Sequence, residues 1–248
     1  MKRMTGPHDQ GLVEAKEAIG RSQNPCCFSG AGLSAPSGVG TFRDPGDGWW
    51  SRHDPMRLAS PEGFAEDPEL VMDWYAARRI QMASARPNAG HLALASRPDI
   101  VQITQNTDDL LRRAGCEHLI QLHGDITADR CHGNCGHVEQ VDMSDPPGNR
   151  SCPVCSSWGM RPTVTWFGES LPSAAWEQAE QTAIKCDLML VVGTSAVVYP
   201  AAALIELASR GGAVIIVVNS EITAATPLAE HELLGSAEDI LPKLLRSR

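Results

Sequence analysis

Residues 26–32 read Cys-Cys-Phe-Ser-Gly-Ala-Gly, and the chain continues as Leu33, Ser34 and Ala35. An apolar run that ends in closely spaced glycines predicts a buried strand entering a tight turn. Gly30, Gly32 and Ala35 fit the G-x-G-x-x-A pattern, in which the first glycine permits the turn and the second lets the backbone approach a pyrophosphate. A helix N-terminus after the turn would offer N–H groups to such an anion. Taken alone, the pattern fits a purely structural turn equally well.

Predicted strands and helices alternate along the rest of the chain. Apolar runs of β type cover residues 100–104, 119–122, 188–192 and 213–218. Helical spacing covers residues 11–21, 67–85, 91–95, 173–184, 201–210 and 237–246. This alternation predicts an α/β fold with a Rossmann-like, doubly wound parallel sheet. Polar or glycine-rich clusters at residues 30, 105, 123, 193 and 219 each follow a predicted strand, so they should meet in one crevice at the carboxyl ends of the strands.

The composition excludes some classes of function. Hydrophobic residues make up 42% of the 248 residues and charged residues 21%, which is typical of soluble globular proteins. The formal net charge of −9 leaves no excess of cations to pair with phosphates, so we expect no nucleic-acid partner. No apolar run approaches the roughly 18 residues of a membrane span, and residues 1–10 lack the apolar core of a signal peptide. We therefore expect no membrane association and a cytoplasmic location.

Four of the eight cysteines form two close pairs. Three residues separate the first pair, two separate the second, and sixteen lie between the pairs. This spacing resembles a zinc ribbon, in which four thiolates hold one structural zinc ion and leave no position open for water. The longer first spacing leaves His132 and His137 as possible substitute ligands, while Cys26 and Cys27 are expected to fill the core. The expected ligands are Cys131, Cys135, Cys152 and Cys155.

An ordinary dehydrogenase is disfavoured by the position of the acidic residues. The usual acidic partner of the glycine pattern lies about 20 residues further on, at the end of a second strand. Here Asp44, Asp47 and Asp54 fall in a segment rich in Pro, Gly, Asp and Trp, which predicts irregular structure with short helical pieces. Glu221, at the end of a later predicted strand, is the better candidate for a ribose contact.

At the level of whole motifs, the chain resembles the sirtuin family over about residues 10–245. The matching segments follow the family's order and comprise residues 30–44, 105–108, 122–124, 161–169, 193–195 and 219–221. The resemblance implies a small lobe inserted into the Rossmann-like domain, and an NAD-dependent protein-lysine deacylase that releases nicotinamide and O-acyl-ADP-ribose. It also implies that the substrates are acylated-lysine proteins, bound as extended peptides.

The resemblance further implies which residues bind NAD. At the glycine turn and in the segment after it, these are Gly30, Ala31, Gly32, Ser34, Thr41, Phe42 and Arg43. The residues expected to hold the ribose and nicotinamide are Gln105, Asn106 and Asp108. The residues expected to hold the adenosine half are Gly193, Thr194, Ser195, Asn219, Ser220, Glu221 and Ala237. Phe42 would also cover the reacting ribose and exclude water.

His123 is the expected general base, and Asn106 and Asp108 are the other expected catalytic residues. In the family's mechanism, a base activates a ribose hydroxyl after nicotinamide has left. Histidine suits this step because it titrates near neutral pH, and a strand end beside Gly124 leaves His123 open to substrate. The alternatives are a hydrogen-bonded structural role for His123 and helix capping by Asn106 or Asp108.

The predicted helix 67–85 carries Tyr75 and Arg78, which share a face because they are three residues apart. A phenol and a guanidinium can pair with a carboxylate, and this Tyr-x-x-Arg pair resembles the class III sirtuins that remove succinyl, malonyl and glutaryl groups. The alternative is a core tyrosine beside a solvated arginine. The segment expected to pair with the substrate backbone and line the acyl-lysine tunnel contains Val164, Trp166, Phe167, Gly168 and Glu169.

Two residues depart from the family pattern, since Gly40 replaces a usual proline and Thr107 a usual Ile or Val. Three other functions stay open: mono-ADP-ribosyl transfer, deacetylation without an acidic-acyl preference, and a non-catalytic scaffold that binds NAD and zinc. The expected Rossmann-like domain comprises residues 1–45, 91–125 and 161–248. The expected small lobe comprises a helical part at residues 46–90 and a zinc-binding module at residues 126–160.

Overall fold

A computed structural model describes residues 7–40 and 54–246. Its largest element is a six-stranded sheet with the order β3-β2-β1-β7-β8-β9, and every pair of neighbouring strands is parallel. The strands are β1 (Pro25–Ser29), β2 (Val101–Thr104), β3 (Leu119–Gln121), β7 (Leu188–Val192), β8 (Val214–Asn219) and β9 (His231–Leu234). Counted along the chain this is the order 3-2-1-4-5-6 of doubly wound dinucleotide-binding folds, which confirms the predicted fold class.

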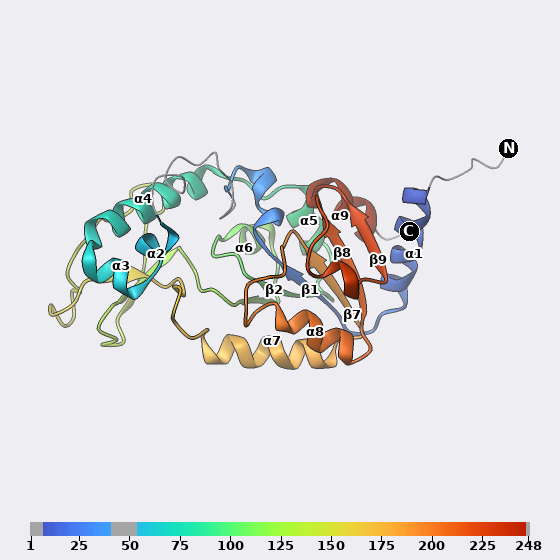
Figure 1. The fold of residues 1–248 in the computed structure, drawn as a ribbon. Coiled ribbons are helices and arrows are strands. Elements are labelled where there is room, and N and C mark those ends of the chain that lie inside the picture. Colours follow the sequence, from blue (N-terminus) through green and yellow to red (C-terminus); the bar gives the residue numbers. More distant parts are fainter. Residues whose placement is uncertain (1–6, 41–53, 247–248) are drawn as a thin grey trace.

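Helices cover both faces of this sheet (Figure 1). One face is covered by α7 (Ser173–Lys185) and α8 (Ala203–Arg210). The other is covered by α1 (Pro7–Arg21), α5 (Ala89–Ala95), α6 (Leu110–Ala114) and α9 (Ala237–Leu245). Central strands such as β7 are buried along their whole length, which explains why they read as continuous apolar runs. Cys26 and Cys27 are free thiols that pack into the two opposite cores, as predicted.

None of the helices in residues 7–40 and 54–246 is long and apolar enough to cross a membrane.

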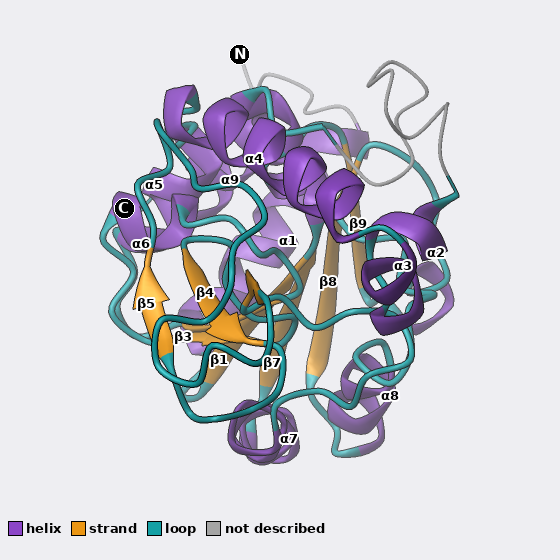
Figure 2. Cartoon of the chain, turned by 90° about the vertical axis from the view of Figure 1, so that its left-hand side faces the viewer, coloured by secondary structure: helices purple, strands orange, loops and turns teal. Residues whose placement is uncertain are grey.

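A smaller lobe lies at one end of the sheet and faces the viewer in Figure 2. Its helices are α2 (Pro55–Leu58), α3 (Pro61–Glu66) and α4 (Pro68–Ser84). Its antiparallel sheet has the order β5-β4-β6 and is formed by β4 (Ala128–Cys131), β5 (Val138–Gln140) and β6 (Met160–Pro162). Asp67 caps α4 by accepting a hydrogen bond from the Leu70 N–H at 3.0 Å. A fully buried ion pair between Arg79 and Asp129 joins α4 to β4.

Three local features differ from the sequence-based expectations. The strand β9 and the five-residue helix α6 were not predicted, because both are short and carry weak periodicity. The glycine turn leads into two 3₁₀ turns, Ala31–Leu33 and Ala35–Ser37, and not into an α-helix. Gly38 ends the second of these turns in a left-handed conformation with φ of 82°.

The glycines of the turn are required where the loops after β1 and β7 meet. The Gly32 N–H donates a hydrogen bond to the Gly193 carbonyl oxygen at 2.8 Å. A Cβ atom on Gly32 would lie 2.7 Å from the Gly193 Cα, and one on Gly30 would lie 2.8 Å from the Thr194 Cβ. Gly193 itself has a φ of 58°, and its Cβ would lie 2.4 Å from the Leu33 nitrogen. The backbones of the two loops are therefore in direct contact at this point, and only glycine leaves enough space for that contact.

We expect Gly32→Ala to lower the free energy of unfolding by about 1–3 kcal/mol, because the added methyl group must push the two loops apart. Denaturant unfolding followed by circular dichroism measures this change. Gly20→Ala is the matched control, since nothing lies within 4 Å of the added Cβ and the residue is inside α1. The control should be neutral or gain about 0.5–1 kcal/mol. A Gly32→Ala protein as stable as the wild type would contradict the account of this contact.

Candidate active site

The polar residues that follow neighbouring strands contact one another at the carboxyl edge of the large sheet. Gln105, after β2, donates from Nε2 to the hydroxyl of Thr194, after β7, at 3.0 Å. The Nδ1 atom of His123, after β3, lies 2.9 Å from the Gln105 carbonyl oxygen. The Gly193 N–H donates to the Val218 carbonyl oxygen at 3.0 Å and so ties β7 to β8. The strand ends thus form one connected region, as their positions in the sequence predict.

Ser34 lies at the centre of a buried polar network. Its hydroxyl donates to Asp108 Oδ2 at 2.9 Å and accepts from Asn106 Nδ2 at 3.1 Å. It also lies 3.4 Å from His91 Nε2. Because His91 Nδ1 accepts a hydrogen bond from the Asn88 N–H at 3.3 Å, we assign the ring proton to Nε2, which faces Ser34. This arrangement gives each group of the network a complementary partner.

Burial shifts the two titratable groups of this network toward their uncharged forms. It raises the pKa of Asp108, although hydrogen bonds from the Leu110 N–H and the Ser34 hydroxyl partly offset the effect. Burial, assisted by the charge of Arg113, lowers the pKa of His91 to about 4. The site therefore presents neutral amide, hydroxyl and imidazole groups near neutral pH.

Helix capping, the alternative role for Asn106 and Asp108, applies only to Asp108. Asp108 Oδ1 accepts a hydrogen bond from the Leu110 N–H at 3.0 Å, so Asp108 supports the start of α6 while its other oxygen contacts Ser34. Asn106 instead donates to the Gly30 carbonyl oxygen and to Ser34, both at 3.1 Å. Asn106 therefore fastens the glycine turn and does not cap a helix.

His123 is held in the orientation that a base requires. Its Nδ1 donates to the Gln105 carbonyl oxygen at 2.9 Å, which leaves the lone pair on Nε2. Burial lowers the pKa of His123, and the hydrogen bond to Gln105 opposes that shift only in part. The next residue, Gly124, has a φ of 77°, and a Cβ there would lie 2.1 Å from the Thr163 carbonyl oxygen. The chain can therefore turn immediately after His123 only at a glycine.

The residues expected at the adenosine half lie along the β7, β8 and α9 side of the same edge. Thr194 is buried, and Asn219 donates from Nδ2 to the Glu221 carbonyl oxygen at 3.1 Å. Ser220 and Glu221 are exposed, and Ala237 is buried at the start of α9. The expected NAD-binding residues that lie outside the described residues are Thr41, Phe42 and Arg43.

The helix α4 carries Tyr75 and Arg78 in one turn. Tyr75 is buried, and its hydroxyl oxygen accepts a hydrogen bond from Trp166 Nε1 at 2.8 Å. Burial raises the pKa of Tyr75 to about 12, although the bond to Trp166 and the charges of nearby arginines, Arg78 among them, act in the opposite direction. The Arg78 guanidinium donates to Gln81 Oε1 at 3.2 Å and to the Gly40 carbonyl oxygen at 3.3 Å. Arg78 thereby joins α4 to the segment after the glycine turn.

Glu169 fixes the shape of the segment 164–169. Arg161 donates to both of its carboxylate oxygens, at 2.7 and 3.0 Å, and the Trp166 N–H donates to Oε2 at 2.8 Å. The Arg161 guanidinium also lies 3.2 Å from the centre of the Trp166 ring. Burial alone would raise the pKa of Glu169, but the Arg161 and Trp166 hydrogen bonds and the charges of Arg161 and Arg130 lower it overall. Glu169 is therefore ionised and firmly held.

The four clustered cysteines fit one zinc ion. Their Sγ atoms all lie within 4.8 Å of one another, and two of the pairs are 3.6 and 3.7 Å apart. Zn–S bonds of about 2.3 Å in a tetrahedron place sulfurs roughly 3.8 Å apart. The two candidate substitutes have other partners: His137 pairs with Glu139 at 2.9 Å, and His132 packs between Phe64 and Trp158. The positioned ligands are Cys131, Cys135, Cys152 and Cys155.

Two residues of these networks were not given a role from the sequence. His91 stands three residues after Asn88, and this spacing could have indicated a capping box in which a histidine takes the usual place of Glu or Gln. Arg161 carries no comparable signal, because its partner Glu169 lies eight residues away across a bend in an irregular segment. A buried ion pair of this kind leaves no periodic pattern in the sequence.

The chain is similar to known proteins by family model, by sequence and by solved structure. A family model described as Sir2 family matches residues 30–200. A relative from Pyrobaculum aerophilum named NAD-dependent protein deacylase 2 is 44% identical over 239 residues, which cover 94% of each chain. A solved Sir2 homologue–NAD complex has a TM-score of 0.88 at 40% identity, covering 94% of this chain and 92% of that one. A Sir2 protein bound to a myristoylated histone peptide has a TM-score of 0.77 at 30% identity, covering 95% of both chains.

The purified protein should contain about one zinc ion per chain, because four thiolates leave the ion strongly bound. We expect Cys152→Ala to lose most of this zinc and to unfold at a lower temperature. The reason is that the antiparallel sheet β5-β4-β6 has only a small hydrophobic core beside the four cysteines. Elemental analysis gives the zinc content and calorimetry the melting temperature. The control Cys116→Ser alters a cysteine outside the cluster and should keep its zinc. Full zinc content in Cys152→Ala would refute the four-cysteine site.

Proposed function

The chain belongs to the Sir2 family and is an NAD-dependent protein deacylase, and we propose that it prefers lysine acyl groups that end in a carboxylate, such as succinyl and malonyl. The family assignment rests on the match over residues 30–200 and on relatives such as the one at 44% identity. One observation carries the acyl preference. Trp166 Nε1 can only donate, so the Tyr75 oxygen must accept its hydrogen bond, and the phenol proton is left for a ligand.

Arg78 would supply the positive charge that a carboxylate requires. It follows Tyr75 by three residues on α4, and its charge acts on the Tyr75 hydroxyl strongly enough to affect the pKa of that group. Because burial keeps the pKa of Tyr75 at about 12, the phenol stays protonated and can donate at neutral pH. Hydrogen bonds to a charged group contribute roughly 1.5–3 kcal/mol. An acetyl group ends in a methyl, so it offers no carboxylate oxygen at that place to make them.

NAD, when bound, supplies the ribose that takes up the acyl group, with nicotinamide as the leaving group. The residues fit such a ligand in position and chemistry, because they lie at the carboxyl edge where the strand order reverses and offer amide, hydroxyl and imidazole donors and acceptors. We infer that Asn106 and Asp108 orient the nicotinamide and ribose, while Ser34 holds both side chains in place.

His123 would accept the proton of the attacking ribose hydroxyl at Nε2. Its Nδ1–H is held by the Gln105 carbonyl oxygen, which fixes the ring orientation and stabilises the charged ring once the proton has arrived. The lowered pKa means that the ring is neutral, and hence competent, at neutral pH.

We infer that the substrate peptide lies in an extended form along Val164–Glu169, which the Arg161–Glu169 pair keeps rigid. Phe167 is 39% exposed in this segment and offers an apolar surface to the lysine stem. We also propose the domain boundaries given by the motifs: residues 1–45, 91–125 and 161–248 for NAD binding, 46–90 for the helical part of the lobe, and 126–160 for the zinc module.

Replacing Arg78 by Met should lower kcat/KM for a succinyl-lysine peptide by about 10- to 100-fold, the equivalent of one lost charge-assisted hydrogen bond. The value for the same peptide with acetyl-lysine should change by less than about threefold. Both are measured by mass spectrometry of the deacylated product.

Arg86→Met is the matched control for this experiment, because Arg86 is exposed just beyond the end of α4. It should leave both values unchanged. If Arg78→Met lowers kcat/KM equally for the succinyl-lysine and the acetyl-lysine peptide, Arg78 has a general structural role and the acidic-acyl proposal is overturned.

The pH dependence of kcat/KM should report the state of His123. Since burial lowers its pKa, the neutral base persists to a lower pH, and activity should fall only as the pH drops below the ordinary histidine value of about 6.5. An acetylated peptide is the right substrate, because its acyl group does not titrate. His123→Ala should lower kcat by about 10²–10⁴ and remove this acid limb. An acid limb centred above pH 7 would argue against His123 as the base.

A further inference from the structure

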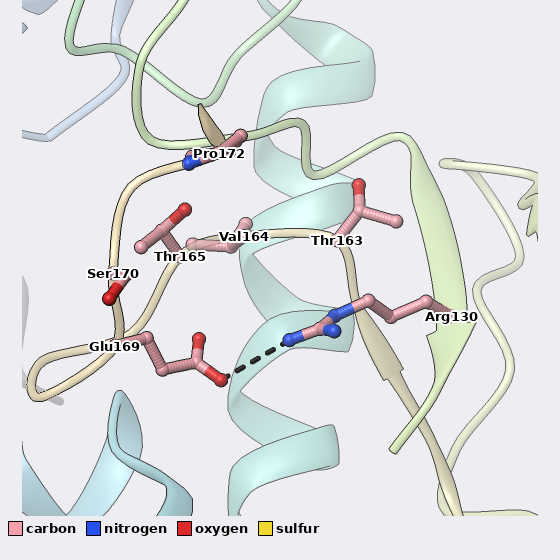
Figure 3. A pocket seen from close by; sticks show the side chains of 7 residues that line it. All are labelled: Arg130, Thr163, Val164, Thr165, Glu169, Ser170 and Pro172. Atoms are coloured by element: carbon pink, nitrogen blue, oxygen red, sulfur yellow. Dashed lines mark hydrogen bonds and ion pairs between the residues drawn. The ribbon is translucent and has the colours of Figure 1, made fainter. Parts of the chain in front are cut away.

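A cavity of about 500 Å³ lies between the strand β4 and the segment that leads into α7. Figure 3 shows Arg130 and Glu169 reaching toward each other, with Thr165 and Ser170 on the neighbouring loop. Arg130 and Glu169 form an ion pair at 3.2 Å, and their side chains are 32% and 20% exposed. The only role described above for Arg130 is to help lower the pKa of Glu169, although it is a cation in a hollow of the size that binds ligands.

The cavity adjoins the expected reaction centre. The N–H of Thr165, whose side chain lines the cavity, donates to the carbonyl oxygen of His123 at 2.9 Å. Val164 and Glu169, which belong to the expected peptide-binding segment, line the cavity as well. A peptide bound along that segment would therefore place a side chain near its acyl-lysine within reach of Arg130.

The cavity is lined by one cation, Arg130, and one anion, Glu169, and a second cation, Arg161, pairs with the same carboxylate from outside the lining. Glu169 is shared by two guanidinium groups, because Arg161 already binds both of its oxygens and Arg130 adds a further contact. The acid next to Arg130 on β4 is Asp129, which is committed to Arg79 and Arg150. Arg130 also donates to the amide oxygen of Asn134 at 2.8 Å, a contact that fixes its position without neutralising it. This surplus of positive charge is local, since the whole chain has a net charge of −9.

We propose that Arg130 is a specificity residue that binds an acidic side chain, Asp or Glu, close to the acylated lysine in the substrate protein. This proposal rests on the deacylase function proposed above and concerns a different part of the substrate from the acyl group. A carboxylate entering the cavity pairs with the Arg130 guanidinium and meets the hydroxyl groups of Thr165 and Ser170. A basic side chain at the same place is disfavoured by Arg130.

The test compares peptides that differ only in one residue near the acyl-lysine, with Glu, Gln or Lys placed in turn at each of the three positions on either side. At one position we expect Glu to raise kcat/KM over Gln by about three- to tenfold, mainly through KM, as suits a partly exposed charge pair. This ratio should fall toward one in Arg130→Gln and should persist in part in Arg130→Lys. Added salt should reduce it in the wild type.

Arg210→Gln is the matched control, because Arg210 is 79% exposed and pairs with Glu206 on α8. It should keep the wild-type ratio. A Glu/Gln ratio that stays the same in Arg130→Gln, or that is close to one at every position in the wild type, would overturn the proposal.

Each peptide is prepared with acetyl-lysine and with succinyl-lysine, so that the two proposals fail separately. Loss of the acyl preference with a preserved Glu/Gln ratio would contradict the acidic-acyl proposal alone. Fluorescence anisotropy of the same labelled peptides provides a Kd ratio that does not depend on turnover. A Kd ratio near one at the position selected by kinetics would also count against Arg130 as a binding residue.

Discussion

The reversal of strand order between β1 and β7 is the constraint on which the rest of the structure depends. The connection after β1 leads to α5 and the connection after β7 leads to α8, and these helices cover opposite faces of the sheet; ligands of doubly wound sheets bind at the carboxyl edge beside such a reversal. Gly30, Gly32 and Gly193 allow the loops after β1 and β7 to touch backbone to backbone. Asn106 then fastens the glycine turn, and the Gln105 carbonyl oxygen orients His123. His123, the proposed base, is therefore positioned by residues that directly follow the strands of the sheet.

The segment 164–169, where we propose that the substrate binds, depends on Glu169 in a comparable way. This carboxylate joins Arg161, Arg130 and the backbone of Trp166, and the Trp166 ring continues the connection to Tyr75. Arg130 lies on β4, the strand that ends at the zinc ligand Cys131. The zinc module thus has a physical link to Tyr75 and the proposed acyl pocket, although no metal chemistry is required of it. Of these charged groups only Arg161 is fully buried, and its two hydrogen bonds to Glu169 hold the segment in place.

The fold could be read from the sequence because each central strand is a continuous apolar run followed by a turn, as in residues 26–32 and 188–193. The cysteine spacing indicated a zinc site but left His132 and His137 as possible ligands, and the structure brings the four cysteine Sγ atoms together. The roles of His91 and Arg161 were not readable from the sequence, since they depend on partners brought together only by tertiary structure. The short strand β9 pairs at the sheet edge through its backbone, and its side chains give little sign of it. Residues 41–43 lie outside the described part of the chain, and their expected contacts with NAD stay predictions.

A competition between two peptides tests the acyl preference most directly. The same sequence, carrying either succinyl-lysine or acetyl-lysine, is mixed in equal amounts with the wild-type protein and limiting NAD, and mass spectrometry follows both peptides in one tube. We predict that the succinylated peptide is consumed first, that its acyl group appears on ADP-ribose, and that neither peptide changes without NAD. Faster consumption of the acetylated peptide would contradict the account, and it would return Tyr75 and Arg78 to a purely structural role.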